Sequence, residues 1–383
     1  MSHPEKRFLT THVGSLPRSQ TVVDQIFMRE RGEPVDQARF DAVMRAAVDE
    51  VVRLQVAAGV DIVCDGEMSK ISYATYIKDR YTGFDGDSPR RTPADLAEFP
   101  GFLTRLAAAG GTPAYRRPCC VGPIALKSPE PLRKDIENLK AAAARHGATQ
   151  LFMNAASPGV VALFQPNRHY PDDDAYLEAL AVALRHEYRT IVDAGLMLQV
   201  DSPDLGLGRH MMYKELDEAA YLARIERHVE ALNHALAAIP AERVRMHICW
   251  GNYEGPHHKD VPLATILPIV LRAKASGLLF EASNPRHAHE WEAIEAARGS
   301  IADDKILIPG VLDSTTNFVE HPRLVAQRIT RYADIVGADR VIAGTDCGFG
   351  TFAGFGAVDP DIVYAKLAAM VEGAHIAGAT ELR

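Results

Sequence analysis

Residues Arg243 to Asp260, RVRMHICWGNYEGPHHKD, begin as a short apolar strand and continue as a loop rich in histidine and glycine. Side chains two residues apart in a strand point the same way, so His247 and Cys249 project to one side. An imidazole and a thiolate suit zinc, which usually binds nitrogen and sulfur ligands in a tetrahedral site. This pair predicts part of a metal site, with plain packing of both side chains as the alternative.

Two later side chains could complete such a site. Glu281 ends GLLFE, the next apolar run, and neighbouring parallel strands lie about 4.8 Å apart. Cys347 follows the last apolar run, within GTDCGFGTF. A buried glutamate is costly unless it is paired or binds a ligand. We therefore predict Zn²⁺ as cofactor, held by His247, Cys249, Glu281 and Cys347.

Polar residues also stand at the carboxyl ends of other apolar runs, where barrel enzymes place their chemistry. They include Ser15, Asp65, Glu67, Asp201, Asp313 and Asp346. We interpret Asp346 as a residue that orients a metal ligand from outside the ligand set. Asn252, after Gly251, belongs to a turn where backbone can approach a substrate closely, and an ordinary turn is the alternative.

These polar ends belong to a repeated alternation of short apolar runs and long amphipathic helices. The predicted strands lie within residues 8–15, 61–67, 117–126, 149–159, 196–204, 243–250, 277–283, 305–313 and 340–346. The clearest predicted helices are 35–58, 131–146, 172–194 and 217–239. Runs that are apolar on both faces are typical of a parallel sheet covered by helices.

This alternation over the whole chain predicts an α/β fold of the TIM (β/α)8 barrel type, as one catalytic domain over residues 1–383. Nine candidate strands compete for eight places, so one lies off the barrel. A doubly wound open sheet is the alternative, and the absence of G-x-G-x-x-G after the first run disfavours it. Residues 71–116 are rich in Gly, Pro and Asp, and form an irregular excursion after the second strand. We interpret it as a lid or a contact with a second copy, which leaves a homo-oligomer open.

The chain has 383 residues, 47% hydrophobic and 24% charged, with a net charge of −8. That balance gives no reason to expect nucleic acid or an anionic membrane as partner. No apolar run approaches the roughly 20 residues that cross a bilayer, and the first residues lack the apolar core of a signal peptide. We expect a cytoplasmic protein whose five cysteines are free or metal-bound thiols.

Six motifs, in order, resemble the catalytic barrel of cobalamin-independent methionine synthases: HVGSLPR, DIVCDGE, LQVDSPD, HIC, FEAS and GTDCGFGT. The resemblance implies that zinc binds the four predicted ligands and that a thiol such as homocysteine receives a methyl group, in the family from a methylated folate. It also implies that Ser15, Glu67 and Asp201 hold the acceptor's amino and carboxylate ends. A structural pairing of Glu67 with Asp65 is the alternative for that residue.

Three departures leave the substrates open. Full-length synthases carry an extra N-terminal barrel, to which none of these motifs corresponds, so we expect a short, single-barrel form. The family's Asp-Glu-Pro reads Asp201-Ser202-Pro203 here, and its Asp-x-His, whose histidine serves folate as proton donor, reads Asp313-Ser314-Thr315. Sequences 249–263 and 310–322 also resemble the epoxyalkane:coenzyme M transferases, zinc enzymes in which a different thiol opens an epoxide.

Zinc coordination deprotonates a thiol and leaves its sulfur nucleophilic. We therefore predict a zinc-dependent thiol methyltransferase, with a small-molecule thiol and an alkyl donor as partners. Asp313, Tyr253, His257 and His258 are candidates for protonating the leaving atom, and the sequence does not choose among them. The alternatives are an epoxide-opening thiol alkyltransferase and a barrel that binds zinc or thiols without catalysis.

Overall fold

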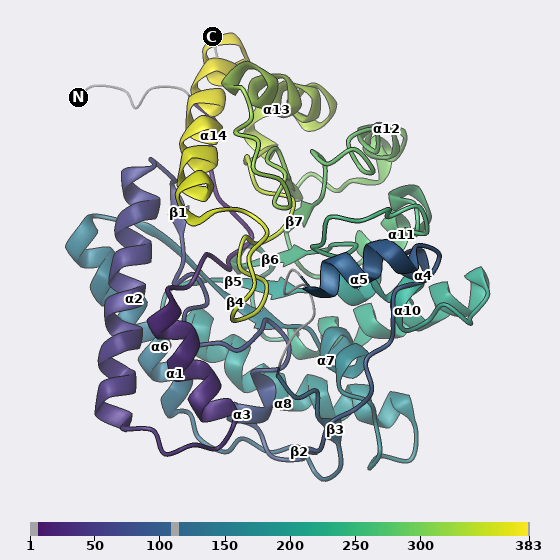
Figure 1. Cartoon of the computed structure of the whole chain (residues 1–383). Coiled ribbons are helices and arrows are strands. Elements are labelled where there is room, and N and C mark those ends of the chain that lie inside the picture. Colours follow the sequence, from purple (N-terminus) through teal and green to yellow (C-terminus); the bar gives the residue numbers. More distant parts are fainter. Residues whose placement is uncertain (1–6, 109–114, 382–383) are drawn as a thin grey trace.

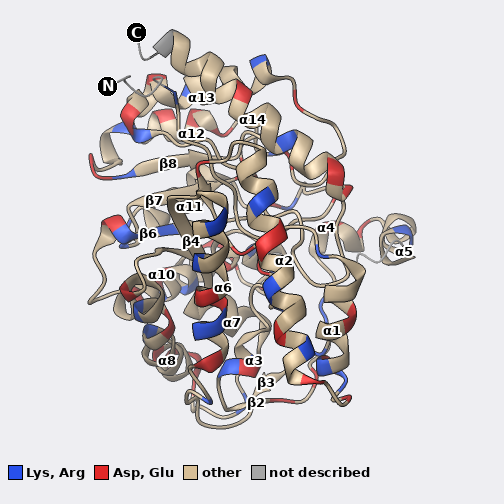
Figure 2. Cartoon of the chain, turned by 90° about the vertical axis from the view of Figure 1, so that its left-hand side faces the viewer, with Lys and Arg blue, Asp and Glu red and all other residues tan. Residues whose placement is uncertain are grey.

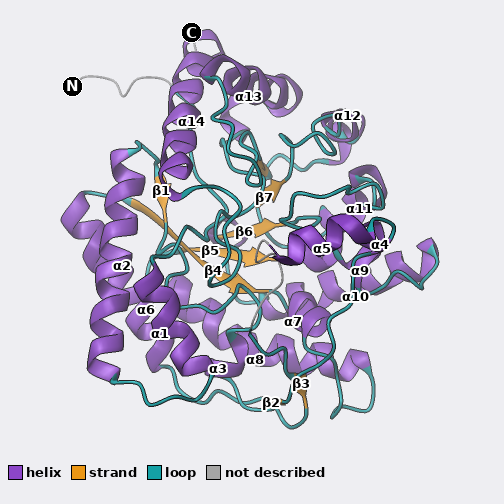
Figure 3. Cartoon of the chain, in the orientation of Figure 1, coloured by secondary structure: helices purple, strands orange, loops and turns teal. Residues whose placement is uncertain are grey.

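The computed structural model describes residues 7–108 and 115–381, and most of its strands lie at the centre of the molecule with helices around them (Figure 3). The strands are β1 (Ile62–Val63), β2 (Phe84–Asp85), β3 (Cys119–Cys120), β4 (Gln150–Ala156), β5 (Met197–Asp201), β6 (Val244–His247), β7 (Gly277–Phe280) and β8 (Ile306–Pro309). The helices are α1 (Gln20–Glu30), α2 (Gln37–Ala57), α3 (Ile77–Arg80), α4 (Ala94–Ala97), α5 (Pro100–Ala108), α6 (Glu130–His146), α7 (Pro158–Phe164), α8 (Asp173–Asp193), α9 (Gly208–Met211), α10 (Glu218–Ala235), α11 (Leu263–Val270), α12 (Trp291–Ala296), α13 (Pro322–Val336) and α14 (Pro360–Glu381).

Six strands form a parallel sheet in the order β1-β4-β5-β6-β7-β8, and two extended segments close it into a barrel. Residues 8–13 lie beside β1, where the Ile62 backbone N–H donates to the Thr10 carbonyl oxygen at 3.1 Å. Residues 341–344 lie beside β8, and the Thr11 N–H donates to the Ala343 carbonyl oxygen at 2.8 Å. The predicted TIM barrel is therefore confirmed, and the open doubly wound sheet is wrong.

Of the nine candidate strands, the one within residues 117–126 lies off the barrel. Its central residues form β3, which pairs antiparallel with β2 in a separate two-stranded sheet. The register places Cys120 opposite Phe84 and Cys119 opposite Asp85. The excursion after β1 thus supplies the hydrogen-bonding partner for an apolar run that would otherwise need a place in the barrel.

The predicted helices agree with α2, α6, α8 and α10 to within a few residues at most of their ends. Figure 2 shows acidic and basic residues interspersed along α2. Its Asp41 and Asp49 pair with Lys134 and Arg145 of α6, at 2.5 and 2.6 Å. Such partly exposed pairs contribute little, so the apolar stripe of α2, with Val48 and Val52 in the main core, holds it on the barrel.

Helix α8 begins at a side-chain cap, because the Asp172 carboxylate accepts a hydrogen bond from the Ala175 N–H at 2.8 Å. Asp172→Ala is expected to lower the free energy of unfolding by about 1 kcal/mol, the usual value of such a cap. Urea unfolding followed by circular dichroism measures it. Asp172→Asn, which keeps the acceptor, is the control and should stay close to the wild type.

The excursion predicted at residues 71–116 holds α3, β2, α4 and α5, and residues 109–114 of it lie outside the described part. Short helices therefore occur where poor periodicity was expected. Figure 1 shows α4 and α5 close together, and Figure 2 shows α5 projecting from one side of the molecule. In the described residues, no helix is both long and apolar enough to span a membrane.

Polar side chains inside the barrel were not predicted. Arg245 of β6 reaches across the interior to the Thr11 hydroxyl at 2.8 Å and the His12 carbonyl oxygen at 3.0 Å. Asn154 of β4 donates to the Val13 carbonyl oxygen at 2.9 Å. These bonds tie the segment 8–13 to strands that are not its neighbours, and so fix Ser15 at the barrel mouth.

Candidate metal and thiol site

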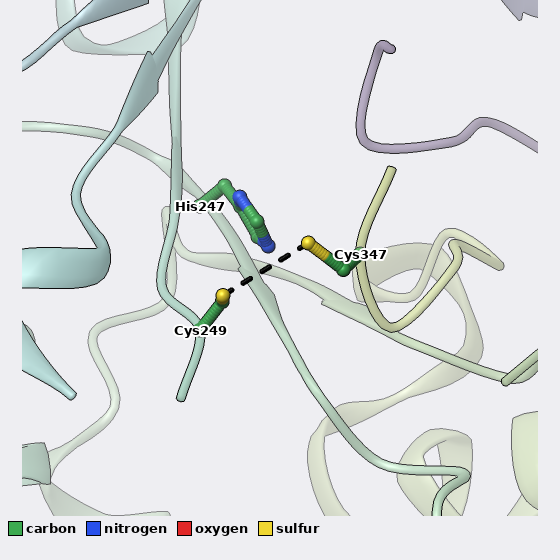
Figure 4. Close-up of side chains that lie close together, drawn as sticks. All are labelled: His247, Cys249 and Cys347. Atoms are coloured by element: carbon green, nitrogen blue, oxygen red, sulfur yellow. Dashed lines mark hydrogen bonds between the residues drawn. The ribbon is translucent and has the colours of Figure 1, made fainter. Parts of the chain in front are cut away.

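Three predicted ligands, His247, Cys249 and Cys347, converge at the carboxyl ends of the strands (Figure 4). One ligand atom from each can be chosen so that all lie within 4.8 Å of one another, and all three residues are buried. The two sulfur atoms are 3.9 Å apart, too far for a disulfide. Figure 4 shows the imidazole directed toward the two sulfurs. His247 ends β6, and Cys347 follows the closing segment 341–344.

Two aspartates lie beside the imidazole, Asp201 through its carboxylate and Asp346 through its backbone carbonyl oxygen, which is 3.4 Å from His247 Nε2. Asp201, in register with His247 on the neighbouring strand, has its carboxylate Oδ1 at 3.5 Å from His247 Nδ1. Burial lowers the pKa of His247 and the Asp201 carboxylate raises it, with a net upward shift. The Asp346 carboxylate accepts hydrogen bonds from the backbone N–H groups of Ala282, Ser283 and Asn284, at 2.8 to 2.9 Å. It therefore ties the Cys347 loop to the end of β7.

Glu281, the fourth predicted ligand, lies outside this group of three described residues. Its carboxylate accepts a hydrogen bond from the Trp250 N–H at 2.7 Å and another from the Asn284 side-chain amide at 2.7 Å. It is 5% exposed. Both oxygens are thus engaged with the protein, and the role of Glu281 as a ligand stays a prediction.

A cavity of about 50 Å³ connects the three ligands with the predicted acceptor-binding residues. Its walls include Ser15, Glu67, Asp201 and Asn252 together with His247, Cys249 and Cys347. The structure thus brings these predicted residues to one place. Ser15 lies so close to Gly348 that a Cβ at position 348 would come 2.0 Å from the Ser15 hydroxyl oxygen. Glycine after Cys347 is therefore what lets these two loops meet.

Glu67, at the wall of this cavity, is a buried carboxyl group with an unsatisfied oxygen and a left-handed backbone conformation. It is 2% exposed, its backbone has φ +58°, and its Oε2 atom is buried with no hydrogen-bond partner among the described residues. Burial raises the pKa of Glu67 to about 7, against the lowering effect of the nearby Lys70 ammonium group. A buried carboxylate without a partner is costly, so this site favours a ligand that carries a hydrogen-bond donor or a positive charge.

Asp201 is oriented by the barrel interior. Its Oδ2 accepts from the Asn154 amide at 3.0 Å and its Oδ1 from the Gln199 amide at 2.9 Å. Asn252 joins three loops, since its amide donates to the Gly348 carbonyl oxygen at 2.6 Å and its Oδ1 accepts from the Ser314 hydroxyl at 2.8 Å. Both residues are therefore fixed before any ligand binds.

The predicted proton donors lie apart from the small cavity. The Asp313 carboxylate accepts from the Thr315 N–H at 2.9 Å and from the Thr316 hydroxyl, within its own loop. His257 has both ring nitrogens occupied, by the Asp260 carboxylate and the Tyr253 carbonyl oxygen, each at 2.9 Å. His258 pairs with Glu98 at 2.8 Å. Their predicted role in proton transfer is not tested by these contacts.

Tyr253 lies in the wall of a second, larger cavity next to the first. Its hydroxyl donates to the Asp95 carboxylate of α4 at 2.8 Å. Burial and this carboxylate raise the pKa of the Tyr253 hydroxyl. Sequence reasoning did not single out Tyr73, Leu207 or Thr351, although they line both cavities, because aromatic, aliphatic and hydroxyl residues in loops carry no distinctive spacing.

Comparison with protein families finds one model that matches residues 157–375, described as the catalytic domain of cobalamin-independent synthases. The matched region includes His247, Cys249, Glu281 and Cys347. Over 372 residues, the chain is 25% identical to a methionine synthase of Saccharolobus solfataricus, covering 96% of this chain and 94% of that protein. A methionine synthase of Thermococcus kodakarensis is 24% identical, with 96% and 92% covered.

Among solved structures, a B12-independent methionine synthase from Shewanella sp. W3-18-1, in complex with selenomethionine, superposes with a TM-score of 0.73. The sequence identity is 18%, and the match covers 97% of each chain. At this identity the likeness concerns the fold. It extends over the whole barrel and so includes the strand ends that carry the three converging side chains.

Proposed function

Because its family model matches more than half of the chain, this protein belongs to the cobalamin-independent methionine synthase family, and we propose that it is a zinc-dependent S-methyltransferase acting on homocysteine. The observation that carries this proposal is the convergence of His247, Cys249 and Cys347 on a cavity whose other walls bear Ser15, Glu67 and Asp201. One end of that cavity suits a metal and a sulfur, and the other suits an amino acid.

The residues fit zinc. Two sulfurs bound to one tetrahedral zinc at about 2.3 Å lie about 3.8 Å apart, and the Cys249 and Cys347 sulfurs are 3.9 Å apart. The Cys249–Cys347 hydrogen bond and burial raise the pKa of the Cys249 thiol, a cost that a cation between the sulfurs would remove. His247, Cys249 and Cys347 would hold the ion, with Glu281 as the fourth ligand after releasing Trp250 or Asn284. Zinc bound there would deprotonate the acceptor thiol and keep its sulfur nucleophilic.

The protein's own residues hold the rest of the acceptor. We assign the Glu67 and Asp201 carboxylates to its ammonium group and the Ser15 hydroxyl to its carboxylate, because all three side chains line the cavity. The Asn154 and Gln199 amides hold the Asp201 carboxylate in place before binding, which lowers its ordering cost. Asp346 and Asp201 position Cys347 and His247. We assign protonation of the leaving atom to Tyr253, which lines the larger cavity. Asp313 and His257, which do not line it, are the alternatives.

Elemental analysis and a methyl-transfer assay test this function. One zinc per chain, and methionine formed from homocysteine with either 5-methyltetrahydrofolate or methyl iodide, would support it. Methyl iodide needs no donor pocket, so it reports on the sulfur alone. Zinc without methylation of homocysteine by either reagent would contradict the proposal and favour a binding protein. Reaction with epoxides alone would favour the epoxide-opening alternative.

Binding of the product should depend on pH through Glu67. Only the ionised carboxylate pairs with an ammonium group, and its pKa is about 7, so methionine should bind about tenfold more tightly at pH 8 than at pH 6. Methionine is the probe because it has no thiol proton to lose. Calorimetric titration across this range measures the dissociation constant. A flat profile would show that Glu67 does not meet the ammonium group.

A further inference from the structure

Arg18 is a charged side chain next to Glu67 that the proposed mechanism does not use. Its Nη1 atom donates to the Gly350 carbonyl oxygen at 2.7 Å, and its Nη2 atom donates to the Glu67 carbonyl oxygen at 2.8 Å. Gly350 belongs to the loop that contains Cys347, whereas Glu67 belongs to the loop after β1. One side chain therefore joins two loops that both line the smaller cavity.

Backbone hydrogen bonds that do not need an arginine also join these two loops. The Leu16 N–H donates to the Gly66 carbonyl oxygen at 3.1 Å, and the Phe349 N–H donates to the Ser15 carbonyl oxygen at 2.8 Å. Both bonds involve the segment just before Arg18. A neutral donor at position 18 would serve the two carbonyl oxygens as well, so attachment of the loops does not explain a positive charge at this place.

The positive charge of Arg18 is costly where it lies. Its Nε atom is buried and has no hydrogen-bond partner among the described residues. Burial lowers the pKa of Arg18, and the Glu67 and Asp65 carboxylates raise it by less than burial lowers it. A buried cation needs compensation by negative charge, and these two carboxylates supply it. Glu67 has the larger effect of the two, so the charge of Arg18 is matched to that of Glu67.

Charged groups from several elements surround the Glu67 carboxyl group, whose pKa burial raises to about 7. The Lys70 ammonium group of the same loop and the Arg18 guanidinium lower this pKa. The Asp201 carboxylate of β5 and the Asp65 carboxylate raise it. The other walls of the smaller cavity include His247, Cys249 and Cys347. Two cations thus support the ionised form of Glu67 against two carboxylates, and loss of either cation shifts the balance toward the neutral form.

We propose that Arg18 is a positioning residue for recognition of the acceptor: its guanidinium holds the Glu67 backbone and balances the carboxylate charge that pairs with the acceptor's ammonium group. This inference rests on the proposed function. Glu67 has φ +58°, a backbone conformation that residues other than glycine rarely adopt, and the hydrogen bond from Arg18 to its carbonyl oxygen restrains it. Arg18 does not line the cavity, so it acts through Glu67 and touches no substrate.

Calorimetric titration of the zinc-loaded protein with methionine, from about pH 6 to pH 8.5, tests this role. Loss of a nearby opposite charge raises the pKa of a carboxyl group, so the midpoint of the binding profile in Arg18→Met should move up by about one pH unit. Binding at pH 7 should weaken about fivefold, and at pH 8.5 it should come within about twofold of the wild type. Arg18→Lys keeps the charge and should keep the wild-type midpoint. A loss that is equal at every pH would mean that Arg18 only supports the loops, and overturns the inference.

A double variant separates an effect through Glu67 from an effect on the whole site. In a Glu67→Gln background the carboxylate is absent, and two groups that act through one contact give losses that do not add. Adding Arg18→Met to this background should therefore weaken methionine binding at pH 7 by less than about twofold. A loss as large as in the wild-type background would show that Arg18 acts independently of Glu67, which contradicts the inference.

Arg243→Met is the matched control. Arg243 is also a partly buried arginine that donates to a carbonyl oxygen, that of Leu196 at 3.0 Å, and its Nε atom is also buried without a partner among the described residues. It precedes β6, at the end opposite to His247, and should leave the pH profile unchanged. If the wild type binds methionine and Arg18→Met keeps its midpoint, the inference alone fails. If the zinc-loaded wild type neither binds methionine nor methylates homocysteine with methyl iodide, the proposed function fails, and the inference with it.

Discussion

Cys249→Ser is expected to remove the metal and methyl transfer together. The Cys249 sulfur lies 3.9 Å from the Cys347 sulfur and within 4.8 Å of a His247 ring nitrogen. It is one of only three ligand atoms in this group, so its loss leaves two. Loss of a residue that merely orients a ligand costs 10- to 100-fold in metal affinity or activity. Loss of the ligand itself should cost more than about a hundredfold in both. Elemental analysis and the methyl-transfer assay with methyl iodide measure the two effects on one sample.

Cys120→Ser is the matched control for this prediction. Cys120 is also a buried free thiol, but it belongs to β3, away from the barrel mouth, where its sulfur contacts the Gly122 carbonyl oxygen at 3.5 Å. It should retain zinc and activity. If Cys249→Ser kept one zinc per chain and most of its methyl transfer, the assignment of this ligand would be wrong, and the proposed mechanism with it.

The convergence of His247, Cys249 and Cys347 could be predicted from the sequence because strand geometry determines where each side chain points. Alternation along β6 places His247 and Cys249 on one side, and parallel strands end at one rim of a barrel, which brings Cys347 near them. The same reasoning could not place Glu281 precisely. The position of its carboxylate depends on the hydrogen bonds to Trp250 and Asn284, which depend on the path of two loops.

Other features depend on contacts between distant segments and leave no pattern in the chain. The run 117–126 has the composition of a barrel strand, and only the pairing of β3 with β2 shows that it lies outside. The larger cavity combines residues of α5, of the loop after β6 and of the loop after Cys347.

Glu67→Gln is expected to impair recognition of the acceptor's ammonium group with little effect on the sulfur. Glu67 is buried at the cavity wall and its Oε2 atom has no partner among the described residues. Removing one member of a buried charge pair costs about 2 kcal/mol or more, so KM for homocysteine should rise by about 30-fold or more while kcat changes much less. The pH dependence of methionine binding should disappear in the same variant, because the group that titrates near pH 7 is gone.

A thiol without the amino group separates this effect from a general disturbance of the site. 4-Mercaptobutyrate is homocysteine lacking its ammonium, so the wild type and Glu67→Gln should alkylate it with methyl iodide at similar rates. Asp65→Asn is the protein control, since Asp65 accepts a hydrogen bond from the Glu67 N–H at 3.0 Å, which asparagine can still do, and does not line the cavity. An equal loss with both thiols would mean that Glu67, whose own backbone has φ +58°, supports the fold of this loop. A loss confined to homocysteine would assign it to the ammonium group.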